Sequence, residues 1–79
     1  MAKKTWSYSQ ITASTENGIA ASMKLSEEAR KEGDNDSARF HRNFAWGKFN
    51  AWSTLTAGWQ KEGDAARLEA MTEFKKEAQ

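Results

Sequence analysis

The sequence predicts an all-α fold, in which a long antiparallel helical hairpin and a short third helix form a three-helix bundle. Three observations predict this fold. The 79 residues contain no proline, the residue that most often interrupts a helix. Apolar residues recur with the helical period from residue 40 to residue 59. The tetrapeptide Lys-Glu-Gly-Asp occurs at 31–34 and again at 61–64, and each copy joins a helix-ending glycine to a helix-capping aspartate.

A first helix is expected over residues 7–32, after a flexible segment at 1–6. Ser7 and Gln10 have the spacing of a capping box, in which each side chain hydrogen-bonds the backbone of the other residue. The stretch after Ile11 is rich in serine and threonine, which are middling helix formers. A restart of the helix near Thr15 is therefore an alternative to a start at Ser7. From Ile19 onward, small and apolar residues share one helical face, which suits close packing against a bulky partner helix.

A second helix is expected over residues 35–62. On a helical wheel its apolar residues cover about half of the circumference, which is wider than the stripe of an ordinary surface helix. One side of this arc holds Phe40, Phe44, Ala51, Leu55 and Gly58, and the other holds Ala38, Ala45, Phe49, Trp52, Thr56 and Trp59. Because the arc keeps one phase throughout, we expect the helix to continue through Gly47. We expect the rest of the chain to cover much of the arc, with a second copy or a partner covering the remainder, and Trp52 to lie at the centre of the core.

A third helix is expected over residues 64–78, with Leu68, Ala70, Met71, Phe74 and Ala78 facing inward. Gly63 is expected to end the second helix and Asp64 to cap the third. The chain of 79 residues is short enough to form a single helical domain, 1–79, with a small core.

Residues 51–74 contain Trp52, Leu55 and Trp59 before the Gly63-Asp64 turn, at spacings that resemble one tetratricopeptide helical hairpin. Ala70 and Phe74 match the small and aromatic positions of that family's second helix only after a slip of two residues. The resemblance implies a helical scaffold that binds peptides or proteins and does no chemistry.

The composition excludes several classes of function. The absence of cysteine excludes disulfides and thiolate catalysis, and no segment has the length and apolarity of a membrane span or the pattern of a signal peptide. We therefore expect a cytoplasmic protein with no membrane partner. No metal-binding or cofactor-binding motif is present, and the single histidine, His41, has only Lys48 near it on the wheel. We expect no catalytic residues, no metal, no cofactor and no enzyme activity.

Trp46 does not fit the apolar arc. It falls on the polar side of the second helix, in a set that comprises Arg39, Arg42, Asn43, Trp46 and Asn50. Tryptophan and arginine dominate the binding energy of many protein interfaces, so this set is the predicted partner-binding surface. The alternative is that the first helix or the segment around Trp6 and Tyr8 covers Trp46.

These observations favour a non-enzymatic protein-binding module, an adaptor or inhibitor that occludes the surface of a partner protein. A small, cysteine-free chain without catalytic motifs is typical of phage or mobile-element effectors. The alternative is a small nucleic-acid-binding protein that uses Arg39, Arg42, Lys48 and Trp46, although a net charge of +1 makes nucleic acid the weaker candidate. Because three short helices leave part of the arc uncovered, we also expect a homodimer.

Overall fold

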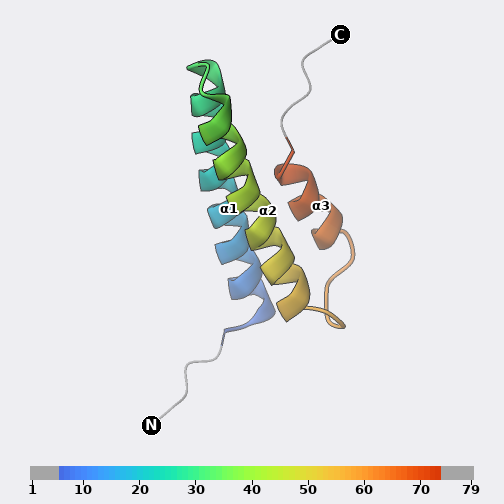
Figure 1. Cartoon of the computed structure of the whole chain (residues 1–79). Coiled ribbons are helices and arrows are strands. Elements are labelled where there is room, and N and C mark those ends of the chain that lie inside the picture. Colours follow the sequence, from blue (N-terminus) through green and yellow to red (C-terminus); the bar gives the residue numbers. More distant parts are fainter. Residues whose placement is uncertain (1–5, 74–79) are drawn as a thin grey trace.

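The computed structural model describes residues 6–73, and its three helices confirm the all-α prediction (Figure 1). Helix α1 spans Tyr8–Lys31, α2 spans Asn35–Leu55 and α3 spans Asp64–Met71. The two long helices pack antiparallel as a hairpin, and the short α3 lies alongside it. The described residues include Trp6, which is exposed, and the remainder of the predicted flexible segment, 1–5, lies outside them.

Helix α1 begins as the capping box predicts. The Gln10 amide donates to Ser7 Oγ at 3.1 Å, and the Ser7 amide donates to Gln10 Oε1 at 2.9 Å. The helix then continues through Thr15, so the alternative start at that residue is wrong. Its end also agrees with the sequence pattern, because Gly33 takes the left-handed conformation, with φ 82°, just beyond the last helical turn.

Helix α2 begins at a side-chain cap and runs unbroken through Gly47, as predicted. The Ser37 amide donates to Asp34 Oδ1 at 3.0 Å, which satisfies one of the unpaired amides of the first turn. The predicted end at residue 62 is wrong, because the helix stops at Leu55. The Thr56 hydroxyl donates to the carbonyl of Trp52 at 2.7 Å, and the left-handed Gly58, with φ 90°, turns the chain away.

Helix α3 is shorter than the prediction of 64–78. It ends at Met71, and the Thr72 hydroxyl just beyond it donates to the carbonyl of Glu69 at 2.7 Å. The predicted inward-facing residues Phe74 and Ala78 lie outside the described residues. Gly63, with φ 88°, occupies the capping position that the sequence pattern predicts for Asp64.

The core lies where the three helices meet. Its buried cluster comprises Ile19 of α1, Ala45, Phe49 and Trp52 of α2, and Leu68 of α3. Trp52 is 1% exposed, and its indole Nε1 donates to Thr12 Oγ1 at 2.9 Å, so its polar atom is satisfied inside the core. Towards the tip of the hairpin small residues replace the aromatics, and Ser26 Oγ donates to the carbonyl of Ala38 at 2.6 Å. The two helix backbones therefore approach closely at that end.

The described helices bury only one side of the aromatic arc, in agreement with the expectation that three helices leave part of it uncovered. The side that contains Ala45, Phe49 and Trp52 is buried, whereas Phe40 and Phe44 on the other side are exposed. The reason is geometric. Helix α1 covers one flank of α2, and α3 covers the adjacent flank, on the far side of Phe49 from Phe40 and Phe44. The remaining flank would need a fourth helix.

Tyr8 fixes the connection between α2 and α3. Its hydroxyl donates to Asp64 Oδ2 at 2.7 Å and accepts from the Lys61 amide at 3.0 Å. The ring of Trp59, predicted to lie in the second helix, instead packs edge-on against Tyr8 with centroids 5.4 Å apart. The first turn of α1 thereby holds the loop that positions α3.

Candidate interaction surface on the second helix

The uncovered flank of α2 carries a continuous apolar strip. We define the aromatic strip as the α2 residues Phe40, Phe44, Gly47, Lys48, Ala51 and Leu55, which share one helical face and are all exposed. Its three large apolar side chains are 58%, 50% and 64% exposed at Phe40, Phe44 and Leu55. The width of the arc predicted that part of it would remain uncovered, because two neighbouring helices cannot cover half of a helix circumference. It did not predict which side of the arc would be exposed, because the two sides have the same periodicity.

Gly47 opens a hollow in the middle of the strip. The hollow has a volume of about 520 Å³ and is lined by Phe40, Asn43, Phe44, Gly47, Lys48 and Ala51. A Cβ at Gly47 would meet nothing within 4 Å, so the described fold does not require glycine there. A glycine inside a helix costs about 1 kcal/mol relative to alanine. The position therefore lowers helix stability with no compensating contact inside the described chain.

Lys48 forms the edge of the strip nearest to α1. Its methylene stem passes beside Gly18, where a Cβ would come within 3.1 Å of Lys48 Cδ. Its ammonium lies 5.8 Å from the centroid of the Phe44 ring, within the range of a cation–π contact. His41 packs edge-on against Phe40 with ring centroids 5.4 Å apart. Both side chains thus contact the aromatic residues of the strip.

The predicted partner-binding residues occupy the next face of α2. Arg39, Asn43, Trp46 and Asn50 are exposed side by side on it. Arg42 is turned towards α3, where its Nε donates to the carbonyl of Thr72 at 3.1 Å. The structure therefore groups four of the five predicted residues on one open face and uses the fifth to hold the end of α3.

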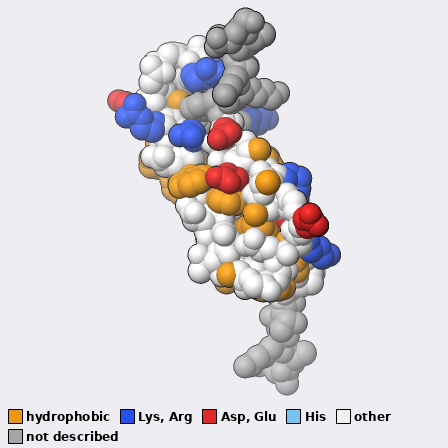
Figure 2. All heavy atoms as spheres, turned by 90° about the vertical axis from the view of Figure 1, so that its right-hand side faces the viewer, with side chains coloured by type: hydrophobic (Ala, Val, Ile, Leu, Met, Phe, Trp, Pro, Cys, Tyr) orange, Lys and Arg blue, Asp and Glu red, His pale blue; other side chains and the backbone are white. Residues whose placement is uncertain are grey.

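Trp46 is only partly covered. Its ring lies 5.5 Å from that of Phe49, centroid to centroid, and its side chain remains 44% exposed. Neither α1 nor the segment around Trp6 and Tyr8 lines the space beside it. A hollow of about 340 Å³ lies there instead, lined by Arg42, Asn43, Trp46, Glu69, Thr72 and Glu73. The side of the molecule on which α3 lies shows acidic side chains among exposed hydrophobic ones (Figure 2).

Charge is distributed unevenly over this surface. Between Asp36 and Glu62 the sequence contains no carboxylate, so beyond Asp36 the exposed faces of α2 carry only basic and neutral side chains. Across the hollow beside Trp46, Glu69 and Glu73 supply negative charge. The surface is thus basic along α2 and acidic where α3 meets it.

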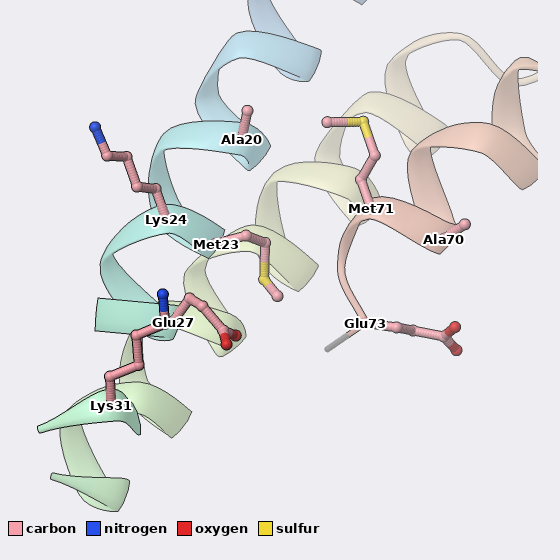
Figure 3. A pocket seen from close by; sticks show the side chains of 8 residues that line it. All are labelled: Ala20, Met23, Lys24, Glu27, Lys31, Ala70, Met71 and Glu73. Atoms are coloured by element: carbon pink, nitrogen blue, oxygen red, sulfur yellow. The ribbon is translucent and has the colours of Figure 1, made fainter. Parts of the chain in front are cut away.

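A third hollow separates α1 from the end of α3. Met23 and Met71 project into the space between the two helices, and Ala20 and Ala70 complete its apolar wall (Figure 3). The volume is about 480 Å³. Glu27, on the rim, accepts from Arg30 Nη2 at 2.6 Å, while Lys24 and Glu73 point away from the space. The described chain ends on this rim, and the hollow brings no converging set of polar groups together.

Two carboxyl groups have lowered pKa values, and both carboxylates hold segments of the fold in place through hydrogen bonds. The amide and hydroxyl of Ser37 hold the pKa of Asp34 below its ordinary value of 3.8 by hydrogen bonding to the carboxylate. The Tyr8 hydroxyl lowers the pKa of Asp64 in the same way, with a smaller contribution from Arg67.

Across residues 6–73, no group of three or more potential ligand side chains is arranged to hold a metal ion. None of the three described helices has the length and apolarity needed to cross a membrane.

Comparisons with protein families, curated proteins and solved structures find no match for this chain. In the segment that resembles a tetratricopeptide hairpin, residues 51–55 and 64–71 are helical and residues 56–63 form the turn between them. The helix before the turn is therefore shorter than the resemblance implies. The exposed surface of α2 is the feature of this chain that points most directly to a function.

Proposed function

We propose that this chain is a non-enzymatic protein-binding module, an adaptor or inhibitor, and that Trp46 anchors its partner. The observation that carries the proposal is the position of Trp46, half-exposed beside a hollow that α3 closes on one side. A tryptophan next to a preformed hollow offers a large contact area at low entropic cost, as interface anchors do.

The chemistry of the hollow indicates which side chain the partner would insert. Glu69 and Glu73 lie on one wall, and the face of an indole ring attracts cations. A lysine or arginine of the partner would meet both the ring and the carboxylates. Asn43 and Asn50, on the same face of α2, can form hydrogen bonds at the rim. The expected partner is thus a protein that presents a basic side chain.

Nucleic-acid binding is the second candidate, because α2 has no carboxylate after Asp36 and Arg39 is exposed. Three features weigh against it. Arg42 is bound to the carbonyl of Thr72, and the Lys48 ammonium lies over Phe44. A phosphate beside a base stacked on Trp46 would also face Glu69 and its neighbour Glu73.

The test compares Trp46→Ala with the matched control Trp6→Ala. The control removes an exposed tryptophan at the N-terminal end of the described chain. Immobilised wild-type protein is exposed to nuclease-treated lysate of its host, the retained protein is purified, and its affinity for each variant is titrated. Trp46→Ala is expected to weaken binding by about 30- to 1000-fold, the range for removal of an interface anchor. Glu69→Gln should weaken it less, and Trp6→Ala should leave it unchanged.

Retention of no protein by the wild type, or equal binding by wild type and Trp46→Ala, contradicts the proposal. Loss of binding in Trp6→Ala alone moves the site to the N-terminal end. A fluorescein-labelled single-stranded oligonucleotide tests the second candidate, since its binding would fall steeply between about 50 and 200 mM salt.

A further inference from the structure

The aromatic strip has an internal symmetry. Its six residues form three pairs around a point between Gly47 and Lys48, and the two members of each pair are equidistant from that point. The inner pair is Gly47 with Lys48, the middle pair is Phe44 with Ala51 and the outer pair is Phe40 with Leu55. A two-fold axis level with that point would place each residue of one copy opposite its pair mate in an antiparallel second copy.

We propose that α2 pairs antiparallel with α2 of a second copy of this chain, strip against strip, and that Gly47 lies at the crossing point. The side-chain sizes are complementary in this arrangement. Phe44 of one copy lies opposite Ala51 of the other, so a large ring meets a small residue. Phe40 lies opposite Leu55, two apolar side chains at each end of the contact.

Gly47 gives the strongest support. The described chain makes no use of its missing side chain, and it lies on the strip that remains uncovered. Two helices that cross near a glycine can bring their backbones closer together, since the glycine contributes no Cβ to the contact. The second copy therefore supplies a reason for a glycine that the single chain does not explain.

The area of the strip suits a weak dimer. From Phe40 to Leu55 the strip extends about 22 Å along the helix, roughly four turns. An aromatic side chain presents about 150–250 Å², so the half-exposed rings and leucines of two copies would bury on the order of 600 Å² of apolar surface. With the flanking polar atoms, this approaches the lower limit of about 1,200 Å² for specific interfaces. A dissociation constant in the micromolar range is expected.

Charge predicts how the dimer responds to salt. Lys48 of one copy and Lys48 of the other lie near the two-fold axis. After Asp36, α2 has no carboxylate that could neutralise these two positive charges. Screening of this repulsion should strengthen the dimer as ionic strength rises. An acidic protein or a nucleic acid on the same strip would show the opposite response.

The dimer and the proposed partner site both use α2, and Asn43 lines the hollow of each. Trp46 lies about 140° around the helix from Ala51, at 100° per residue. Its hollow therefore stays open in the pair, and the two interactions can fail independently.

The first experiment measures the mass of the intact chain by sedimentation equilibrium across micromolar concentrations. The expected mass rises to twice the monomer mass of 8.9 kDa, and the dissociation constant falls as salt increases. Phe44→Ala should weaken the dimer at least about 30-fold. Gly47→Ala should weaken it about tenfold while raising the melting temperature of the dilute protein by about 4–8 °C, because alanine favours the helix. Trp46→Ala is the matched control and should leave the dissociation constant unchanged.

A second experiment tests the antiparallel arrangement, since the chain has no natural cysteine. Asn43 and Thr54 flank the strip on the same side, and antiparallel pairing brings Asn43 of one copy near Thr54 of the other. A short bis-maleimide should link a mixture of Asn43→Cys and Thr54→Cys chains into heterodimers and should link neither variant to itself. The monomer mass at all concentrations overturns the inference, as do dimers insensitive to Phe44→Ala or efficient self-linking of either cysteine variant.

Discussion

Two tryptophans six residues apart on α2 have opposite environments. Trp52 is 1% exposed and bonded to Thr12, whereas Trp46 remains 44% exposed beside a hollow. The difference arises from rotation, because six residues turn the helix by about 240° at 100° per residue. At the scale of single residues, position on the wheel decides whether an indole stabilises the fold or is available to a partner.

Trp52→Ala is expected to destabilise the fold by about 3–5 kcal/mol. The substitution leaves a cavity between the three helices and leaves the Thr12 hydroxyl without its indole donor. A chain of 79 residues has a total stability of about 4–12 kcal/mol, so much of the population should unfold. Thermal unfolding followed by circular dichroism measures the effect. A melting temperature within a few degrees of the wild type would refute the packing described for Trp52, and Trp46→Ala is the same-residue comparison.

At the scale of elements, the loop after α2 is fixed by α1. Tyr8 holds both ends of residues 61–64 through its hydroxyl, and Trp59 packs on its ring. These contacts replace the helical turns that the periodicity predicted over residues 56–62. The bond from the Thr56 hydroxyl to the carbonyl of Trp52 and the left-handed Gly58 end the helix, and both act over a few residues. The position of the loop beyond it is set by bonds between residues that are 53 and 56 positions apart in the sequence.

The Tyr8–Asp64 bond predicts an acid-dependent loss of stability. Because the pKa of Asp64 is lowered in the folded chain, its carboxylate stabilises the fold above the ordinary value of 3.8. This stabilisation disappears as the pH falls below 3.8 through the lowered pKa. Asp64→Asn should melt earlier than the wild type at about pH 7, and the difference should shrink as the pH is lowered from about 5 to 3. Tyr8→Phe should reduce the same pH dependence, whereas a constant difference over that range would show that the Asp64 charge has no role.

At the scale of the whole molecule, one buried cluster joins all three helices. The hairpin and α3 share it through Leu68, and Arg42 ties the end of α3 to α2. The short α3 buries few residues of its own, so its stability depends on the hairpin. The same asymmetry leaves one flank of α2 without a neighbour in the described chain, and that flank is the aromatic strip.

Leu68→Ala should destabilise the whole chain and leave a single unfolding transition. The side chain is fully buried, and its truncation is expected to cost about 2–5 kcal/mol. Since Leu68 belongs to the same cluster as Trp52, tryptophan fluorescence and circular dichroism should shift together. Two separate transitions, with the hairpin unchanged, would mean that α3 folds independently of the hairpin.

The candidate site was predictable in part. Trp46 stood out in the sequence because an aromatic residue broke the polar side of a helical wheel, and it is indeed exposed with Arg39, Asn43 and Asn50. Its acidic neighbour Glu69 was not predictable, because it comes from α3 and reaches the hollow only through the tertiary fold. The binding role of these residues remains the prediction that Trp46→Ala tests.

The sequence by itself determined that the chain forms three helices, how the first two begin and where the centre of the core lies. Capping boxes, helix-ending glycines and the period of apolar residues act over a few positions, so Ser7, Gly33 and Trp52 could be assigned without a structure. Only the tertiary structure decided which half of the aromatic arc is buried and where α2 ends. Those outcomes depend on how many helices surround α2 and on distant contacts such as that of Tyr8 with Asp64. Phe40 and Phe44 have the same periodicity as core residues, and they are exposed because no described helix covers them.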